Sequence, residues 1–191
     1  AGGGGLSGAG DDAAAAAVSG ECEADFDLGM RSNLEATHKM LEGCRALSTQ
    51  HGTQPVFVFA SSLAVFGKQP GRPLPDPITD DTLPTPQGSY GIQKFICEQL
   101  VADYTRKGFV AGRSVRPMTV SVRPGKPNGA ASGFFSGMVR EPLAGVRAQV
   151  PVPADTPVAL ASPGNTIAGF VRAAEVSDAQ WGPPTAINLP S

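Results

Sequence analysis

The sequence predicts an α/β domain built on a parallel sheet, and three patterns carry that prediction. Residues 55–60 read Pro-Val-Phe-Val-Phe-Ala, a short apolar run typical of a strand buried on both faces. Helical patterns stand on both sides of it, at residues 24–47 and 90–107, and a second strand pattern occupies residues 115–122. Strands that alternate with helices of these lengths favour parallel pairing.

The first helix is indicated by apolar residues that recur along one of its faces. Met30, Leu34, Leu41 and Cys44 fall on that face, with charged residues elsewhere. The stretch before it, residues 1–17, is a Gly- and Ala-rich low-complexity segment with almost nothing to bury. We therefore divide the chain into that segment and one domain at residues 18–191.

The second helix is expected to turn Ile92, Phe95, Ile96 and Leu100 toward the core. Pro117 interrupts the second strand because it lacks a backbone N–H. The remaining elements are predicted as loops at 67–88 and 123–128, helices at 132–143 and 166–176, and an edge strand at 158–161.

Composition excludes several classes of protein. The formal net charge is −2 and only 17% of residues are charged, so we expect no nucleic-acid partner. No apolar run approaches the roughly 20 residues that span a bilayer, so no membrane partner is expected. The three cysteines are odd in number and lack C-x-x-C spacing, which favours a reducing compartment. We therefore expect a cytoplasmic protein without a metal site.

The strongest chemical signal is Tyr90-Gly-Ile-Gln-Lys94. Positions i and i+4 share one face of a helix, so the phenol and the ammonium point the same way. We expect the ammonium to stabilise the phenolate and to lower the pKa of Tyr90 toward neutrality, which would make Tyr90 an acid/base for a substrate hydroxyl. The alternative is a surface pair without a role.

Two hydroxyls follow the first predicted strand. Ser61 and Ser62 stand at its carboxyl end, the edge at which open α/β sheets bind ligands. A serine there can hydrogen-bond a reacting oxygen. Each serine alone is more commonly an ordinary strand-end residue, but the tyrosine and lysine nearby favour a site.

Two cations follow the second predicted strand. Arg123 and Lys126 stand in the loop just past its end, where they can clamp a substrate carboxylate. The alternative, held as equally good, is that both are solvated loop charges.

Several motifs in order resemble the extended short-chain dehydrogenase/reductase family. They are S-S-L-A-V-F-G at 61–67, an acidic-x-x-Pro segment at 81–84, Y-G-I-Q-K at 90–94, N-L-E-A-T at 33–37 with Ala36 in place of the family's glycine, and V-S-G at 18–20. Within the family, three segments look most like the D-erythronate dehydrogenases: V-S-G-E-x-E-A-D-F-D-L-G at 18–29, S-S-L-A-V-F-G at 61–67 and V-R-P-G-K-P-N at 122–128.

The resemblance implies a role for each matching residue. Tyr90 would be the catalytic acid/base, and Lys94 would lower its pKa and hold the nicotinamide ribose. Ser62 would hydrogen-bond the reacting oxygen, and Asn33 would support a water that relays the proton. Ser19, Ser61 and Thr119 would lie beside the cofactor, NAD. The implied reaction is hydride transfer from a secondary hydroxyl of a small sugar acid.

The resemblance also implies a Rossmann-like, doubly wound sheet that is incomplete, because the first βαβ unit and the C-terminal lobe of the family are missing from this sequence. A homodimer or a protein partner would cover the open sheet edge. Two alternatives stay open: a nucleotide-sugar epimerase or dehydratase with the same catalytic residues, and a degenerate, non-catalytic subunit of a larger assembly.

Overall fold

The computed structural model describes residues 19–124, 130, 132–183 and 185–190. The Gly- and Ala-rich segment 1–17 and Lys126 lie outside these residues. Along the described chain the elements are α1 (Ser19–Ala24), α2 (Phe26–Gly29), the π-helix η1 (Met30–Glu35), α3 (Ala36–His51), β1 (Val56–Ala60), the 3₁₀ turn η2 (Leu63–Val65), α4 (Ser89–Arg106), β2 (Ala111–Arg116), β3 (Thr119–Val120), α5 (Gly133–Leu143), β4 (Leu160–Ala161), α6 (Pro163–Glu175), α7 (Asp178–Trp181) and β5 (Ile187–Asn188).

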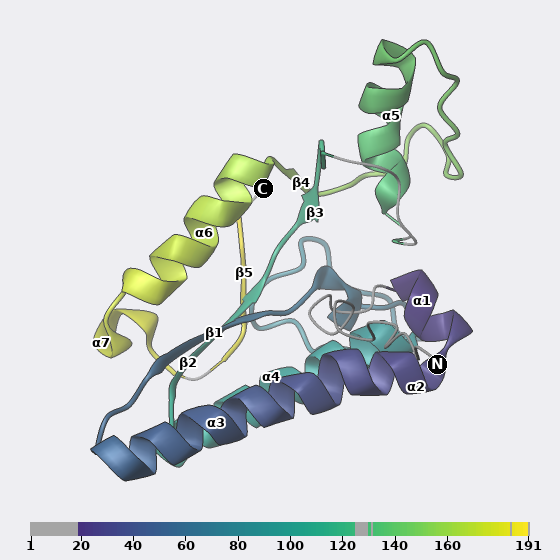
Figure 1. Cartoon of the computed structure of the whole chain (residues 1–191). Helices are drawn as coiled ribbons and strands as arrows, with labels where there is room; N and C mark the ends of the chain where they lie inside the picture. Colours follow the sequence, from purple (N-terminus) through teal and green to yellow (C-terminus); the bar gives the residue numbers. More distant parts are fainter. Residues whose placement is uncertain (1–18, 125–129, 131, 184, 191) are drawn as a thin grey trace, which may run out of the picture.

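The main sheet confirms the predicted α/β class with parallel strands. Its order is β1-β2-β5, and both pairings are parallel. β1 and β2 pair in register from Val56 opposite Ala111 to Ala60 opposite Val115. Helices α3 and α4 cover one face of this sheet and α6 covers the other (Figure 1). The carboxyl ends of β1 and β2 therefore open at the same edge of the sheet.

A second, smaller sheet begins where the first one stops. Pro117 interrupts the strand predicted at 115–122, as expected, but β2 begins earlier than predicted, at Ala111. After Pro117 the chain resumes as β3, which pairs in parallel with β4. Helix α5 stands beside this pair, apart from the layers of the main sheet (Figure 1). Phe135 O of α5 accepts a hydrogen bond from Ser121 Oγ at 3.3 Å, and this bond ties α5 to the end of β3.

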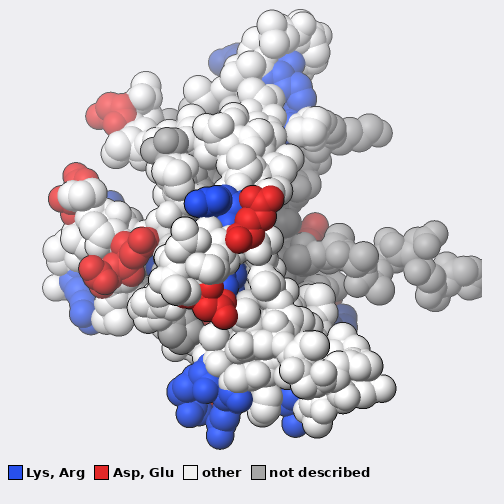
Figure 2. Space-filling model, turned by 90° about the vertical axis from the view of Figure 1, so that its left-hand side faces the viewer, with Lys and Arg blue, Asp and Glu red and all other residues white. Residues whose placement is uncertain are grey.

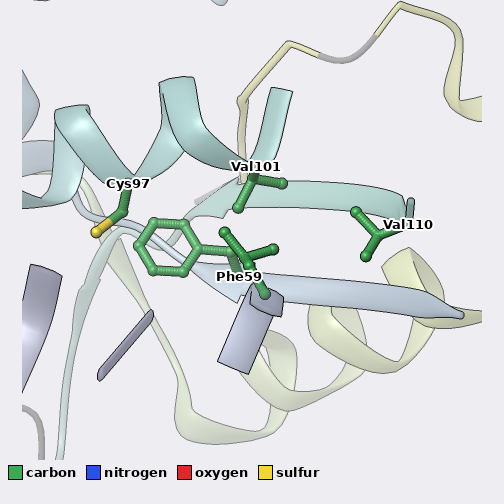
Figure 3. Close-up of a cluster of buried hydrophobic side chains, with 5 residues drawn as sticks. Phe59, Cys97, Val101 and Val110 are labelled. Carbon is green, nitrogen blue, oxygen red and sulfur yellow. The ribbon is translucent and has the colours of Figure 1, made fainter. Parts of the chain in front are cut away.

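The core lies between α4 and the main sheet. Figure 3 shows the Phe59 ring of β1 beside Cys97 of α4, with Val101 and Val110 completing the cluster. Leu41 of α3 is fully buried in the same cluster. Burying one such side chain stabilises the fold by about 1.5–3 kcal/mol, so this cluster fixes α4 against the end of β1.

Local signals set the helix ends. Asp25 caps α2 by accepting a hydrogen bond from Leu28 N at 2.8 Å, so the helix predicted over residues 24–47 begins at Phe26 and continues through η1 into α3. At its other end, α3 runs on to Gly52, which adopts the left-handed conformation at φ 63°. Ser162 caps α6 and Pro163 occupies its first turn, so this helix begins before the predicted residue 166.

Two predictions about burial are wrong. The run 55–60 is a strand, but its two faces are not both buried: Val56 is 50% exposed, because β1 pairs with β2 alone within the described chain. In α4, Ile92 and Ile96 are 44% and 39% exposed, and the helix buries Gln93, Lys94 and Glu98 in their place.

The surface carries few charges. On the face drawn in Figure 2, acidic and basic side chains are scattered over a largely uncharged surface. Within the described residues, no helix combines the length and apolar character that crossing a membrane requires.

Candidate active site

The predicted site residues meet in one cleft at the carboxyl ends of β1 and β2. The cleft has a volume of about 380 Å³. Six of the residues singled out in the sequence line it: Ser19, Ser61, Ser62, Tyr90, Thr119 and Arg123. The structure thus brings together residues that lie more than a hundred positions apart in the chain.

Ser62 and Tyr90 face each other across the floor of this cleft. Ser62 is the N-terminal residue of the η2 turn, and its Oγ accepts a hydrogen bond from Ala64 N at 3.1 Å. This contact leaves the Ser62 proton available for donation, and the Ser62 side chain hydrogen-bonds Tyr90. Tyr90 is on the first turn of α4, where Gly91 packs directly on the backbone of Ala64.

Lys94 lies one turn further along α4 and is only 7% exposed. Its Nζ donates a hydrogen bond to Ala60 O at 2.9 Å and lies 5.6 Å from the centroid of the Tyr90 ring. Burial lowers the pKa of Lys94, while the nearby thiols of Cys97 and Cys22 act in the opposite direction. An ammonium thus lies beside the phenol, as the spacing predicted.

The predicted effect on the tyrosine pKa is wrong for this structure. Burial raises the pKa of Tyr90 above its ordinary value of 10.0, the hydrogen bond from Ser62 lowers it, and the Cys22 thiol raises it. The Lys94 ammonium lies over the ring and donates to Ala60 O. The hydrogen bond from Ser62 favours the phenolate.

An ion pair that the sequence patterns did not reveal lies behind the serines. Arg116, the last residue of β2, donates to both carboxylate oxygens of Glu98 at 2.8 and 2.7 Å. The hydroxyl of Ser61 also donates to Glu98. All three residues are at least 95% buried. The periodicity of apolar residues could not reveal the pair, because it treats polar residues as solvent-facing. The one signal in the sequence is that Glu98 stands four residues after Lys94 on the same helix.

Asn33 lies behind the cleft and does not line it. Its side-chain Nδ2 donates to Gln93 Oε1 at 2.8 Å and to Cys22 Sγ at 3.3 Å. Its backbone carbonyl accepts a hydrogen bond from Cys97 Sγ at 3.6 Å. Asn33 is on the π-helix η1, so an extra residue in that turn brings it against α4. The role of Asn33 in supporting a water stays a prediction.

Arg123 contributes a half-buried cation to the cleft. Its backbone N–H donates to Ser136 Oγ at 2.9 Å and its carbonyl accepts from Arg140 Nη1 at 3.0 Å, so α5 holds the residue in place. Among the described residues, Nη2 of Arg123 is buried and has no hydrogen-bond partner. A guanidinium that lines a cleft can bind a carboxylate through charge-assisted hydrogen bonds.

A nicotinamide nucleotide fits the chemistry of these residues. Lys94 is not among the residues that line the cleft, but within the described chain its ammonium donates one hydrogen bond, to Ala60 O, so two N–H groups remain for ribose hydroxyls. The hydroxyls of Ser19 and Thr119 line the same cleft. Ser61 also lines it, although its proton is donated to Glu98.

Comparisons with known proteins agree with this arrangement. D-erythronate dehydrogenase of Cupriavidus necator is 52% identical over 176 residues, which make up 92% of this chain and 52% of that protein. D-erythronate dehydrogenase of Haemophilus influenzae is 45% identical over 92% of this chain and 53% of its own length. The chain thus spans about half the length of the curated relatives it matches.

A solved structure shares both the fold and much of the sequence. The nucleoside-diphosphate-sugar epimerase from Agrobacterium tumefaciens superposes with a TM-score of 0.83 at 45% identity, over 92% of this chain and 50% of that one. The sequence pattern of the NAD dependent epimerase/dehydratase family matches residues 12–181. Because that match takes in most of the chain, the protein belongs to the NAD dependent epimerase/dehydratase family.

Proposed function

We propose that the protein is an NAD-dependent dehydrogenase that oxidises a secondary hydroxyl of a small sugar acid such as D-erythronate. One observation carries the proposal: Ser62 hydrogen-bonds Tyr90 in a cleft that Arg123 also lines. The identity of 52% to a D-erythronate dehydrogenase supports the choice of substrate.

Each residue then has a defined task. Arg123 binds the substrate carboxylate through charge-assisted hydrogen bonds, and this contact fixes which hydroxyl reaches Tyr90. Ser62 hydrogen-bonds that hydroxyl oxygen, and the Tyr90 phenolate takes its proton as the carbonyl forms. Lys94 holds the cofactor ribose. NAD⁺, when bound, supplies the acceptor for the hydride that leaves the carbinol carbon.

We also propose a role for Lys126 and a cytoplasmic setting. Lys126, three residues after Arg123 in the sequence, is proposed as a second cation for the substrate carboxylate. All three cysteines are free, which agrees with a reducing compartment.

The outer edge of β1 is unpaired within the described residues, which supports a homodimer or another protein segment as its cover.

The test begins with cofactor binding by the purified chain. We expect NAD⁺ to raise the temperature of thermal unfolding, with half-saturation below about 1 mM, since bound ligand stabilises the folded state by mass action. NADP⁺ serves as the comparison. Half-saturation well above that concentration would leave only a non-catalytic role for this chain.

The second step is turnover. D-erythronate with NAD⁺ should give NADH, and Y90F should lower kcat by about 10²–10⁴-fold, the usual contribution of a general acid/base. Unchanged turnover in Y90F would refute the assignment of Tyr90. Conversion of a nucleotide sugar without net NADH formation would favour an epimerase instead, the activity named for the Agrobacterium relative.

A further inference from the structure

Three residues spaced four apart on α4 contact three consecutive residues at the end of β1. Tyr90 hydrogen-bonds Ser62, Lys94 donates to Ala60 O, and Glu98 accepts from the hydroxyl of Ser61. Tyr90 and Lys94 have tasks in the proposed function, whereas Glu98 does not reach the cleft. Glu98 nevertheless continues the same row of contacts, one turn deeper in the protein.

Glu98 is held in turn by the neighbouring strand. Arg116 binds both of its carboxylate oxygens, and the Arg116 guanidinium lies 5.0 Å from the centroid of the Phe66 ring. Ser61 is fixed to β2 a second time, because its backbone N–H donates to Val115 O at 2.8 Å. Helix α4 and the ends of β1 and β2 thus meet at one buried carboxylate.

We propose that Glu98 and Arg116 are positioning residues that hold the Ser62 hydroxyl against the Tyr90 phenol. The proposal rests on the proposed function, since it explains how the catalytic hydroxyls stay aligned. Ser62 directly follows Ser61, so a shift of Ser61 away from Glu98 carries Ser62 with it. A rigid support of this kind is what hydroxyls in an active site need in order to act at fixed distances.

A second ion pair on β2 provides a matched control. Arg113, three residues before Arg116, is also a buried arginine that binds a carboxylate, that of Asp178. It lies nearer the other end of β2, beside Trp181, and its guanidinium is 5.3 Å from the centroid of that ring. D178N therefore disturbs a buried arginine of the same strand without touching the cleft.

The experiment follows the Tyr90 side chain directly. The chain contains two tyrosines, so labelling with tyrosine enriched in ¹³C at Cζ gives two resonances, and Y90F identifies the one from Tyr90. S62A removes the hydrogen bond to Tyr90 and defines the full displacement of that resonance. No cofactor or substrate is added, so the outcome is independent of whether the chain oxidises a sugar acid.

The decisive variant replaces both charges, E98M with R116M, because removing one partner alone would strand a buried charge. We expect the Tyr90 resonance to move in the direction set by S62A by more than half of the S62A displacement, and D178N to leave it in place. A folded double variant with a smaller displacement, or an equal one in D178N, overturns the proposal. If the double variant does not fold, S61A decides by the same criterion, since it keeps the ion pair and removes only the Ser61–Glu98 hydrogen bond.

Discussion

The Lys94 ammonium lies 5.6 Å from the centroid of the Tyr90 ring while it donates a hydrogen bond to Ala60 O at 2.9 Å. It therefore approaches the face of the phenol and is held by the end of β1. The Y-x-x-x-K spacing led us to expect that Lys94 both holds the cofactor and lowers the pKa of Tyr90, and this geometry assigns the two roles to different residues. Lys94 is placed to hold a cofactor, whereas the charged form of Tyr90 depends on Ser62.

Replacing Lys94 with methionine is expected to spare stability and to weaken cofactor binding. Burial disfavours the ammonium, so K94M should unfold at the same temperature as the parent or higher. Its advantage should shrink as the pH rises through the lowered folded-state pKa of Lys94 and vanish above 10.5, where lysine becomes neutral in the unfolded state as well. The affinity for NAD⁺ should fall at least about tenfold, through loss of charge-assisted hydrogen bonds. Thermal unfolding with and without NAD⁺ measures both effects, and a loss of several degrees without NAD⁺ would contradict the first.

Removing the Ser62 hydroxyl is expected to raise the pKa of Tyr90 further. Burial raises that pKa and the hydrogen bond from Ser62 lowers it. Because S62A removes the hydrogen bond and keeps the burial, the pKa of Tyr90 should rise. The ultraviolet absorbance of the phenolate reports the titration, and the Y104F background removes the only other tyrosine. An unchanged or lower pKa in S62A, with the fold intact by circular dichroism, would show that Ser62 does not stabilise the phenolate.

Arg123 is expected to act on substrate binding and not on the chemical step. A lost charge-assisted hydrogen bond costs about 1.5–3 kcal/mol, so R123M should raise KM for the sugar acid roughly tenfold to a hundredfold. The change in kcat should stay within about twofold, since the carboxylate is bound equally before and during the reaction. R147M, at an exposed arginine outside the cleft, is the control. Equal effects on KM for both variants would contradict a carboxylate clamp.

Gly91 is expected to tolerate no side chain. A Cβ there would lie 2.1 Å from Ala64 O and 2.9 Å from Ala64 C, and backbone atoms cannot move aside as a flexible side chain can. G91A should therefore destabilise the fold by about 1–3 kcal/mol. Gly43 on α3 has open space around it, so G43A should stabilise by up to about 1 kcal/mol through helix propensity. Urea unfolding of both variants tests the contrast, and similar losses in the two would refute the close approach of α4 to η2.

Local patterns in the sequence were sufficient for most of the helices and for the residues of the cleft. The hydroxyl pair after the strand and the Y-x-x-x-K turn could be recognised because each is compact in sequence. Their meeting in space follows from parallel pairing of β1 with β2, which the apolar run at 55–60 indicated.

The buried face of α4 could not be predicted in the same way. The apolar pattern placed Ile92 and Ile96 inward, but the residues that α4 buries include three polar ones, Gln93, Lys94 and Glu98. Their partners Asn33, Ala60 and Arg116 are between 18 and 60 positions away. A periodicity argument treats polar residues as solvent-facing, so it fails where distant partners satisfy their hydrogen bonds.

Strand β5 was missed for a different reason. It pairs with β2 over only two residues, Ile187 and Asn188. A strand of two residues is too short to show an alternation of apolar and polar side chains. Its position also depends on Asp80, whose carboxylate accepts a hydrogen bond from Asn188 N at 2.6 Å. The 108 residues between these two partners put the contact beyond local reasoning.

The break at Pro117 means that the two walls of the cleft come from two different sheets. The wall with Ser62 and Tyr90 is part of the layered β1-β2-β5 body, whereas the wall with Thr119 and Arg123 belongs to the β3–β4 pair and α5. Substitutions near β3 and α5 can therefore change how the substrate carboxylate is bound, while Ser62 and Tyr90 keep their alignment. Protein engineers who want a new acid oxidised should thus randomise β3 and the first turns of α5 and leave α4 untouched.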